Sequence, residues 1–311
     1  MKTKFTNLHN LEQYFADENT CVEYLEVQRW IEPACLRCGG LNPYVIKAKR
    51  KGYKCRDCGY KFNVLTGTIF ENSKLPLIIW FKAIYIATSH KKGISSLQLG
   101  KDLGITQKTA WFVLSRIREL LKEKAPVMLE NTVEIDETFV GGKFANRPQS
   151  FKARYNKTAG RSESNKTVVF GLLQRDGKVV NKVVKNTTKD ELFPVIEKHV
   201  AKGSRMVTDE WKSYVRLPEL GYTHESVRHN IGEYVNGDVH TNGIEGYWSN
   251  LKRGIIGIYH QVSPKHLHRY CDEFSFRYNT RKEKEADRFA LALGQTDNSR
   301  LKYFELIKKV E

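Results

Sequence analysis

The segment "TVEIDETFVGG", Thr132–Gly142, combines the pattern of a buried strand with acidic residues that strands rarely bury. Val133 and Ile135 occupy alternate positions, which is typical of the inner face of a β-strand. Glu134 and Asp136 lie in the same run, although carboxylates are poor strand formers and are costly to bury without a partner. The segment therefore predicts a core strand whose acidic side chains have a partner of their own.

The rest of the chain is strongly basic, which makes those carboxylates more unusual. It has 311 residues with 52 Lys+Arg against 35 Asp+Glu, a formal net charge of +17. The hydrophobic fraction of 40% is that of a folded protein, and the length allows two or three domains. A surplus of positive charge can simply keep a protein soluble, but one this large favours a polyanionic partner such as nucleic acid.

The N-terminal segment "MKTKFTNLHNLEQYFADENT" has no apolar core typical of a signal peptide, and no run approaches the length of a membrane span. We therefore expect a cytoplasmic protein with no membrane partner. In a reducing compartment the six cysteines indicate bound metal rather than disulfides. Cys21 and Cys271, outside any pair, are expected to be plain buried thiols.

The other four cysteines predict a zinc ribbon over residues 25–72, after a helical segment over 1–24. The two CxxC pairs, separated by sixteen residues, are each followed by a glycine that can adopt positive φ. Four thiolates make a closed site for one structural zinc ion, and the short β-like runs around them favour a ribbon over a helical finger. The expected ligands are Cys35, Cys38, Cys55 and Cys58.

Residues 73–124 predict a helical domain that contains a helix-turn-helix. Ser95 or Ser96 can cap a short helix, Gly104 suits the turn, and Thr106 can cap a longer second helix. An ordinary helical hairpin would give the same pattern, but the ribbon and the basic charge favour DNA binding. The residues expected to contact DNA are Gln107, Lys108 and Arg116.

Residues 125–285 predict an α/β domain. Three strands, a helix through about Val200 and a fourth strand ending at Asp209 follow one another. Asp136 therefore lies in the first strand and Asp209 at the end of the fourth. Between the first and second strands, residues 143–166 form a basic loop with seven Lys/Arg and one Glu, which is either a phosphate contact or a solvated loop.

A later amphipathic helix in "HTNGIEGYWSNLKRG" supplies a third carboxylate, Glu245, with 35 residues between it and Asp209. Glu245 and Lys252 lie seven positions apart and therefore on nearly the same side of the helix. Each acid alone could be a turn, salt-bridge or surface residue. Together they suit two divalent cations such as Mg²⁺, which prefer oxygen ligands and can promote phosphodiester chemistry.

These motifs resemble bacterial insertion-sequence transposases that carry an N-terminal zinc ribbon and an RNase H-like DDE domain, a family related to eukaryotic Merlin DNA transposons. The resemblance runs from "CLRCGG" through "EIDETFVGGK" and "TDEWKSY" to "HTNGIEGYWSNLKRGIIGIYH" and "EFSFRYNTR". It implies a multidomain α+β protein whose catalytic domain is RNase H-like (retroviral integrase-like), followed by a C-terminal extension over residues 286–311.

The resemblance also implies catalytic, metal-binding roles for Asp136, Asp209 and Glu245. The third role could instead fall to a nearby asparagine, because some relatives use asparagine there; the candidates are Asn242 and Asn250. A carboxylate is the better ligand for a divalent cation, and this favours Glu245. Lys252, and Arg253 beside it, are expected to contact the transposon end.

The implied activity is that of a DNA transposase, with two Mg²⁺ or Mn²⁺ ions and one structural zinc ion as cofactors. The enzyme would bind the inverted repeats of its element, cleave a strand and join the 3′ end to target DNA, as a homo-oligomer associated with the nucleoid. Two other interpretations stay open. One is a DNA-binding regulator without catalysis, and the other is an RNase H-like nuclease that cuts DNA without joining it.

Overall fold

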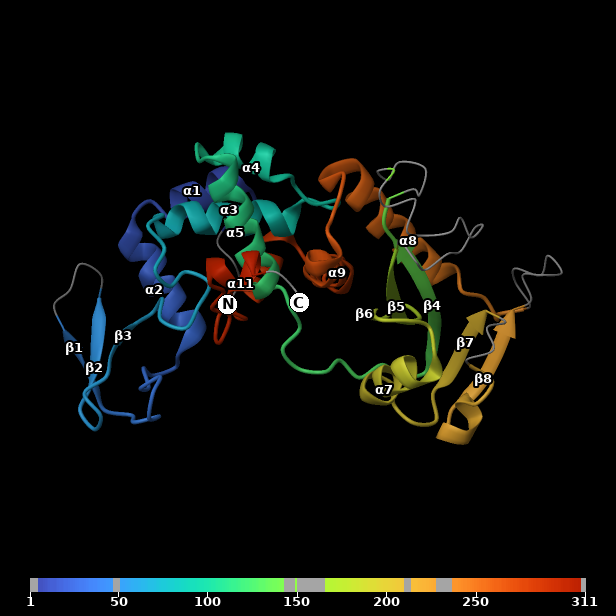
Figure 1. The fold of residues 1–311 in the computed structure, drawn as a ribbon. Helices are drawn as coiled ribbons and strands as arrows, with labels where there is room; N and C mark the ends of the chain where they lie inside the picture. The colour runs from blue at the N-terminus through green and yellow to red at the C-terminus, as the bar shows by residue number, and fades with distance from the viewer. Residues whose placement is uncertain are drawn as a thin grey trace. The chain divides into compact units, whose positions relative to one another are not determined.

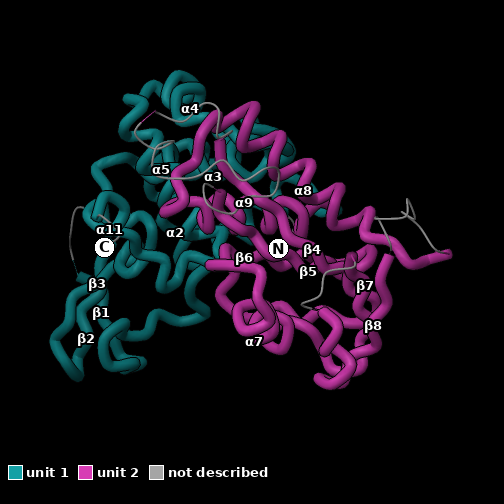
Figure 2. Tube along the Cα trace, turned by 45° about the vertical axis from the view of Figure 1, so that its right-hand side comes forward, with its two compact units in different colours: residues 1–122, 282–311 teal, residues 123–281 magenta. Residues whose placement is uncertain are grey.

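The chain folds into two compact units in a computed structural model that describes residues 5–46, 51–142, 149, 166–209, 214–227 and 237–308. Unit 1 combines Met1–Lys122 with Lys282–Glu311, and unit 2 comprises Glu123–Arg281 (Figure 2). The chain therefore leaves unit 1, forms unit 2 and then returns. The basic loop predicted over residues 143–166 falls almost wholly outside the described residues.

Unit 1 holds the zinc ribbon and a bundle of helices (Figure 1). Its ribbon is a three-stranded antiparallel sheet in the order β1-β2-β3. The helices from the N-terminal part and those from the C-terminal return belong to the same unit. The elements are α1 (Leu8–Tyr14), α2 (Glu18–Arg29), β1 (Pro43–Ile46), β2 (Gly52–Cys55), β3 (Lys61–Asn63), α3 (Leu77–Ser89), α4 (Ser96–Leu103), α5 (Gln107–Leu120), α10 (Glu285–Leu293) and α11 (Tyr303–Ile307).

Helices α4 and α5 form the predicted helix-turn-helix. Ser95 caps α4 by accepting a hydrogen bond from the N–H of Gln98, and Thr106 caps α5 in the same way. Gly104 ends α4 with φ of 63°, a left-handed conformation that favours glycine. At Gly100 a Cβ would lie 2.9 Å from the carbonyl oxygen of Ile105, so glycine permits the close approach of the turn. The local sequence pattern therefore predicted this element correctly.

The C-terminal return completes the core of unit 1. Phe289 in α10 is fully buried and packs edge-on against Phe5 and Phe81, with ring centroids 5.4 and 5.5 Å away. Residues 286–311, predicted as a C-terminal extension, thus supply core side chains to the same unit as the helix-turn-helix. Edge-to-face aromatic pairs of this kind stabilise a core beyond the area they bury.

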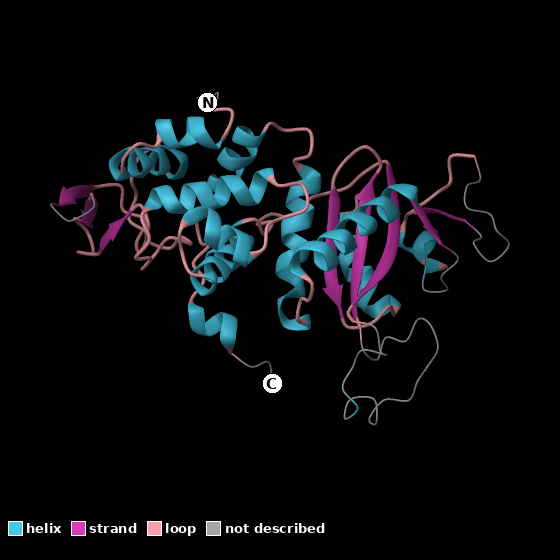
Figure 3. Cartoon of the chain, turned by 90° about the horizontal axis from the view of Figure 1, so that it is seen from above, coloured by secondary structure: helices cyan, strands magenta, loops and turns pink. Residues whose placement is uncertain are grey.

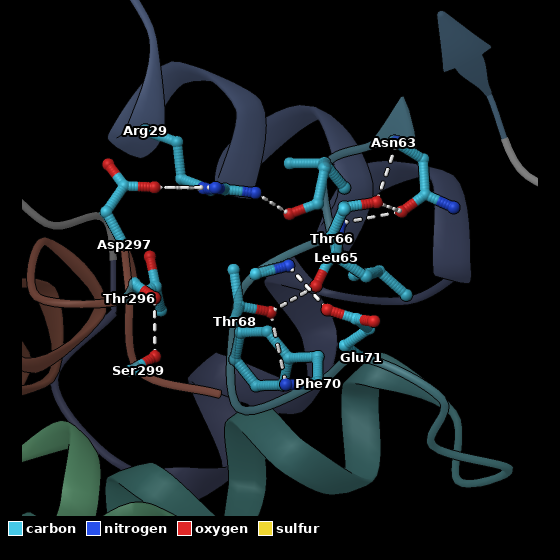
Figure 4. Close-up of polar contacts among 12 residues, drawn as sticks. Arg29, Asn63, Leu65, Thr66, Thr68, Phe70, Glu71, Thr296, Asp297 and Ser299 are labelled. Carbon is cyan, nitrogen blue, oxygen red and sulfur yellow. Dashed lines mark hydrogen bonds and ion pairs between the residues drawn. The ribbon is translucent and has the colours of Figure 1, made fainter. Parts of the chain in front are cut away.

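Polar contacts also join the return to the N-terminal part (Figure 4). Arg29 at the end of α2 donates from Nε to Asp297, at 2.8 Å, and from its guanidinium to the carbonyl of Val64. The N–H of Ile69 donates to Ser299 Oγ at 3.2 Å. These hydrogen bonds connect the end of α2 and the segment that follows β3 to the C-terminal return.

Unit 2 is built on a five-stranded mixed sheet in the order β6-β5-β4-β7-β8. Strands β4, β5 and β6 pair antiparallel, whereas β7 and β8 follow in parallel pairs. The first four strands and the helix before the fourth agree with the sequence prediction, and β8 was not anticipated. The elements are β4 (Thr132–Val140), β5 (Thr167–Gln174), β6 (Val179–Val184), α7 (Lys189–His199), β7 (Arg205–Asp209), η4 (Leu217–Leu220), β8 (Thr223–Val227), α8 (Asn242–Gly254), η6 (Ile255–Tyr259) and α9 (Pro264–Asn279).

Helices cover the sheet of unit 2 (Figure 3). Val133 and Ile135 belong to a core cluster that includes residues of α7, whereas α8 and α9 contribute to a separate cluster with Val169 and Leu173 of β5. Because side chains alternate along a strand, these clusters lie on opposite faces. This order and layering are those of an RNase H-like domain, as predicted. Among the described residues, none of the helices has the length and apolar character needed to cross a membrane.

We predict that Phe289→Ala lowers the free energy of unfolding of unit 1 by about 3–5 kcal/mol, the usual cost of removing a fully buried aromatic side chain. Leu291→Ala, in the same helix but 48% exposed, is the control and should change it by less than about 0.5 kcal/mol. Chemical denaturation followed by fluorescence would measure both. Equal effects of the two variants would contradict a structural role for the C-terminal return.

Candidate active site and zinc centre

The sheet register brings Asp136 and Asp209 together. Strands β4 and β7 are parallel neighbours, with Glu134 paired to Val207. Asp136 and Asp209 stand two residues further along these neighbouring strands, beyond the last paired residues, and the charge of Asp209 acts on Asp136. The neighbouring apolar residues of both strands belong to one core cluster, which holds the ends of the two strands in place.

Helix α8 brings the third carboxylate to the same place. Trp248 in α8 donates its indole N–H to Asp136 Oδ2 at 3.0 Å. Glu245 lies one turn earlier, with Oε1 held by the hydroxyl of Thr241 at 3.0 Å. The indole also covers Gly171, the residue paired with Asp136 on β5. A Cβ at Gly171 would lie 2.4 Å from the ring, so only glycine lets α8 pack this closely.

The electrostatics of the site indicate that it suits cations. The pKa of Asp136 is raised to about 7, mainly by burial and also by the charges of Asp209 and Glu245, against the lowering effect of its hydrogen bonds. Asp209 Oδ1 is buried and has no hydrogen-bond partner among the described residues. A buried carboxylate oxygen without a donor is an environment that a cation would relieve. Among the described residues, the four ribbon cysteines are the group of ligands close enough together to hold a metal ion, and the three acids do not form a second such group. Their carboxylate oxygens are still of the type that Mg²⁺ or Mn²⁺ prefers.

A fourth acid, Glu137, points to the opposite face of β4. Its carboxylate accepts a hydrogen bond from the hydroxyl of Tyr214, a fully buried residue beyond the end of β7. Burial raises the pKa of Glu137 to about 8, and the nearby Asp136 and Asp209 add to the rise. Glu137 thus packs beneath the site, where it supports Tyr214.

The outer side of α8 presents the basic residues predicted beside Glu245. Lys252 and Arg253 are both exposed, and Arg253 donates to Asn250 Oδ1 at 2.9 Å. The two asparagine alternatives to Glu245 are exposed as well. Glu245 is exposed too, so exposure does not distinguish the three candidates, and Glu245 is the one of them whose charge acts on Asp136 because the asparagines carry none.

In the helix-turn-helix, two of the three residues predicted to contact DNA are available. Gln107 and Lys108 are exposed in the first turn of α5. The prediction for Arg116 is wrong, because its side chain is buried and donates from Nε to the carbonyl of Leu301 at 3.0 Å and from Nη1 to the carbonyl of Ile69. Its position on α5 faces the core of unit 1, and its charge is satisfied by backbone oxygens there.

The four ribbon cysteines form a metal-binding cluster. Their sulfur atoms all lie within 4.8 Å of one another, with Cys35–Cys58 and Cys38–Cys55 each 3.6 Å apart. Gly39 and Gly59 follow the two pairs with φ of 75° and 70°, so the predicted knuckle turns are present. The cluster packs against Tyr53, Phe62 and neighbouring rings. This arrangement is that of a closed structural zinc site.

Several supporting residues were missed by reasoning from sequence. Trp248, Gly171, Tyr214 and the buried Glu134 act across strands and helices that are distant along the chain. Of these residues, only Trp248 could be singled out from the local sequence, because it lies three residues after Glu245 on the apolar side of the helix. Contacts of this kind become visible once the register of the sheet is known.

For the zinc centre, we predict that Cys55→Ser loses the bound zinc and destabilises the ribbon, because a structural zinc site contributes folding free energy directly. Metal analysis of the purified protein should find one zinc ion per chain in the wild type and almost none in the variant. Cys21→Ala, which removes a thiol outside the cluster, serves as the control and should retain the zinc. Full zinc occupancy in Cys55→Ser would contradict the assignment.

For the acids, we predict that Asp136→Asn stabilises the protein at pH 8 in buffer without added Mg²⁺ or Mn²⁺. A carboxyl group with a raised pKa in the folded state destabilises it increasingly as the pH rises from about 4 through 7. The asparagine oxygen can still accept from Trp248. The melting temperature should rise by roughly 2–4 °C per kcal/mol relieved, and the gain should shrink as the pH falls towards 5.

An exposed acid gives the control for this measurement. Asp190→Asn in the first turn of α7 makes the same chemical change on the surface and should alter the melting temperature little at either pH. If Asp136→Asn melted at a lower temperature than the wild type at pH 8, the charged Asp136 carboxylate would not be destabilising the folded protein.

Comparisons with known proteins agree with these features. Residues 128–279 match the model of the ISXO2-like transposase domain, and residues 16–61 match that of the transposase zinc-ribbon domain. The chain is 32% identical over 274 residues to an uncharacterized protein in transposable element ISH50 of Halobacterium salinarum, covering 85% of this chain and 91% of that protein. An uncharacterized transposase-like protein of Haemophilus influenzae is 28% identical over 102 residues, 33% of this chain and 81% of that protein.

Solved structures of the Mos1 transposase are more distant. The Mos1 strand transfer complex covers 64% of this chain and 73% of its own at 11% identity, with a TM-score of 0.24, too low to indicate a shared arrangement. The two matched domains and the long alignment with the archaeal protein are the stronger evidence. The chain belongs to the family of transposases with an ISXO2-like transposase domain and a transposase zinc ribbon.

Proposed function

We propose that this transposase binds the inverted repeats of its own insertion sequence and catalyses metal-dependent cleavage and joining of DNA strands. The observation that supports this most strongly is that Asp209 and Glu245 lie near enough to Asp136 for their charges to raise its pKa, with an unpartnered buried oxygen on Asp209. A regulatory domain without catalysis has no need of three mutually repelling carboxylates at one edge of a sheet. The cluster therefore favours an enzyme over a regulator.

Each of the three acids has a defined task in this proposal. Asp136, Asp209 and Glu245 would hold two Mg²⁺ or Mn²⁺ ions, which supply activation of the attacking oxygen and stabilisation of the leaving oxygen. Trp248 orients Asp136 through its indole N–H, and Thr241 orients Glu245 through its hydroxyl. With the carboxylates held in place, the ions that they bind would supply a fixed position for the reacting phosphate and the attacking hydroxyl, which would lower the entropic part of the barrier.

The basic residues would hold the DNA. Lys252 and Arg253 extend from the same helix as Glu245, so they can contact phosphates next to the reacting one. Gln107 and Lys108 stand at the N-terminus of α5, where a helix-turn-helix contacts bases and phosphates. The net charge of +17 provides the general attraction to the duplex. Two ends must meet before joining, which favours a homo-oligomer on DNA.

We predict that Asp209→Asn abolishes strand joining, with a loss of more than about 10³-fold, while binding to the transposon ends is retained. The assay uses labelled duplexes of the flanking repeats, a plasmid target and Mg²⁺ or Mn²⁺, with joined product resolved on a gel. Asp190→Asn, an exposed acid on α7, is the matched control and should join ends at the wild-type rate.

The same assay separates the alternatives. Cleavage by the wild type without any joined product would indicate a nuclease, and specific binding without cleavage would indicate a regulator or an inactive copy. If Asp209→Asn joined ends at the wild-type rate, the assignment of the metal-binding acids would be wrong.

A further inference from the structure

Glu134 is a buried carboxylate that has no part in the chemistry described above. It lies in β4 two residues before Asp136, so both side chains point to the face that α8 covers. Only 1% of Glu134 is exposed. Burying a carboxylate this deeply is costly unless it is paired and hydrogen-bonded, so its partners indicate its role.

Glu134 caps helix α8 from a neighbouring strand. Its Oε2 accepts a hydrogen bond from the N–H of Ile244 at 2.9 Å, in the first turn of α8. A helix N-terminus favours negative charge and leaves its first N–H groups without partners in the helix. The residue at the N-cap position, Thr241, accepts no such hydrogen bond from the first turn, and its hydroxyl donates to Glu245 instead. Glu134 takes over the capping, and Thr241 is left to orient Glu245.

The other oxygen of Glu134 fixes the segment that leads into α8. Arg175 donates from Nε to Glu134 Oε1 at 3.2 Å. The same guanidinium donates to the carbonyls of Asp238 and His240, at 2.9 and 3.1 Å. One carboxylate and one guanidinium therefore hold both the approach to the helix and its first turn.

Gly243 shows how closely the helix and the carboxylate approach. A Cβ at this position would lie 2.7 Å from Glu134 Oε2, closer than real Cβ contacts allow. A larger residue at position 243 would displace the Glu134 carboxylate, the first turn of α8, or both, and would so disrupt the cap. Since Glu245 lies two residues further on, a shift of the first turn would also move its carboxylate relative to Asp136.

We propose that Glu134 is a positioning residue that sets the place of Glu245, and with it the divalent-cation site, by capping α8 from β4. The inference rests on the proposed function, because it assumes that Glu245 binds a cation. Glu134 and Trp248 then act as two anchors, one at the first turn of α8 and one at the next, that register the helix against the strand carrying Asp136. Supporting contacts around a metal site commonly change its affinity by about 10–100-fold when removed.

The test uses the full-length zinc-loaded protein and Mn²⁺ as the probe, with binding measured by titration calorimetry in the absence of DNA. Glu134→Gln keeps the shape of the side chain but cannot accept from both Ile244 and Arg175 with a full charge. We expect its dissociation constant for Mn²⁺ to rise about tenfold or more. Hydrogen exchange by mass spectrometry, without Mn²⁺, should show faster exchange in the first turn of α8, whereas α7 and α9 should stay protected.

Two further variants make the result interpretable. Glu130→Gln, the same change at an exposed site four residues earlier, should leave Mn²⁺ binding and exchange unchanged. Gly243→Ala approaches the contact from the helix and should reproduce the loss of Mn²⁺ affinity, so the inference does not depend on one variant remaining folded. Binding to transposon ends should be intact in all of them, which a general loss of structure would not allow.

The outcomes distinguish this inference from the proposed function beneath it. If Asp209→Asn binds Mn²⁺ as well as the wild type does, the cation site itself is wrongly assigned. If Asp209→Asn loses Mn²⁺ while Glu134→Gln and Gly243→Ala bind it within about twofold of the wild type, the site stands and the positioning role of Glu134 is refuted.

Discussion

The contact on which the catalytic unit depends is the packing of α8 against β4, because it must hold like charges together. Burial raises the pKa of Asp136, and the like charges of Asp209 and Glu245 contribute to the same rise. Without opposing contacts, repulsion between the carboxylates would favour a larger separation of α8 from β4. Apolar packing of Trp248 on Gly171, its hydrogen bond to Asp136, and the cap that Glu134 places on α8 oppose this repulsion. Repulsion between the acids lowers the stability of the fold, and the packing of the surrounding core compensates for this loss.

This constraint explains the pattern of acids in β4. The strand carries three acids, Glu134, Asp136 and Glu137, and each has a separate partner: the first turn of α8, the indole of Trp248 and the hydroxyl of Tyr214. A strand that buries unpartnered carboxylates would be unstable. The acidic residues that make "TVEIDETFVGG" look unlike a core strand are thus the points at which elements from both faces of the sheet are attached to it.

The sequence was sufficient for elements whose signals are local. The CxxC pairs, the caps at Ser95 and Thr106 and the turn at Gly104 depend on neighbours within a few residues, and each is found where it was predicted. Contacts over long separations were not predictable in this way. Arg116 carries the surface signal of a DNA-binding helix, yet it is buried because a segment nearly two hundred residues later packs over it. Glu134 and Tyr214 likewise gain their roles only through the register of the sheet.

The return of the chain to unit 1 has a consequence for how the protein is made. The helix-turn-helix shares its core with α10, and Arg116 in α5 is satisfied by the carbonyl of Leu301. Until residues 282–308 have been synthesised, Phe81 and Arg116 lack partners that the folded unit supplies. An open aromatic core is costly, and the Arg116 guanidinium would lack the carbonyl of Leu301 while keeping that of Ile69, so the ribbon and helix-turn-helix of a nascent chain would be incompletely stabilised. The element expected to recognise DNA therefore reaches full stability only after the catalytic unit has been translated.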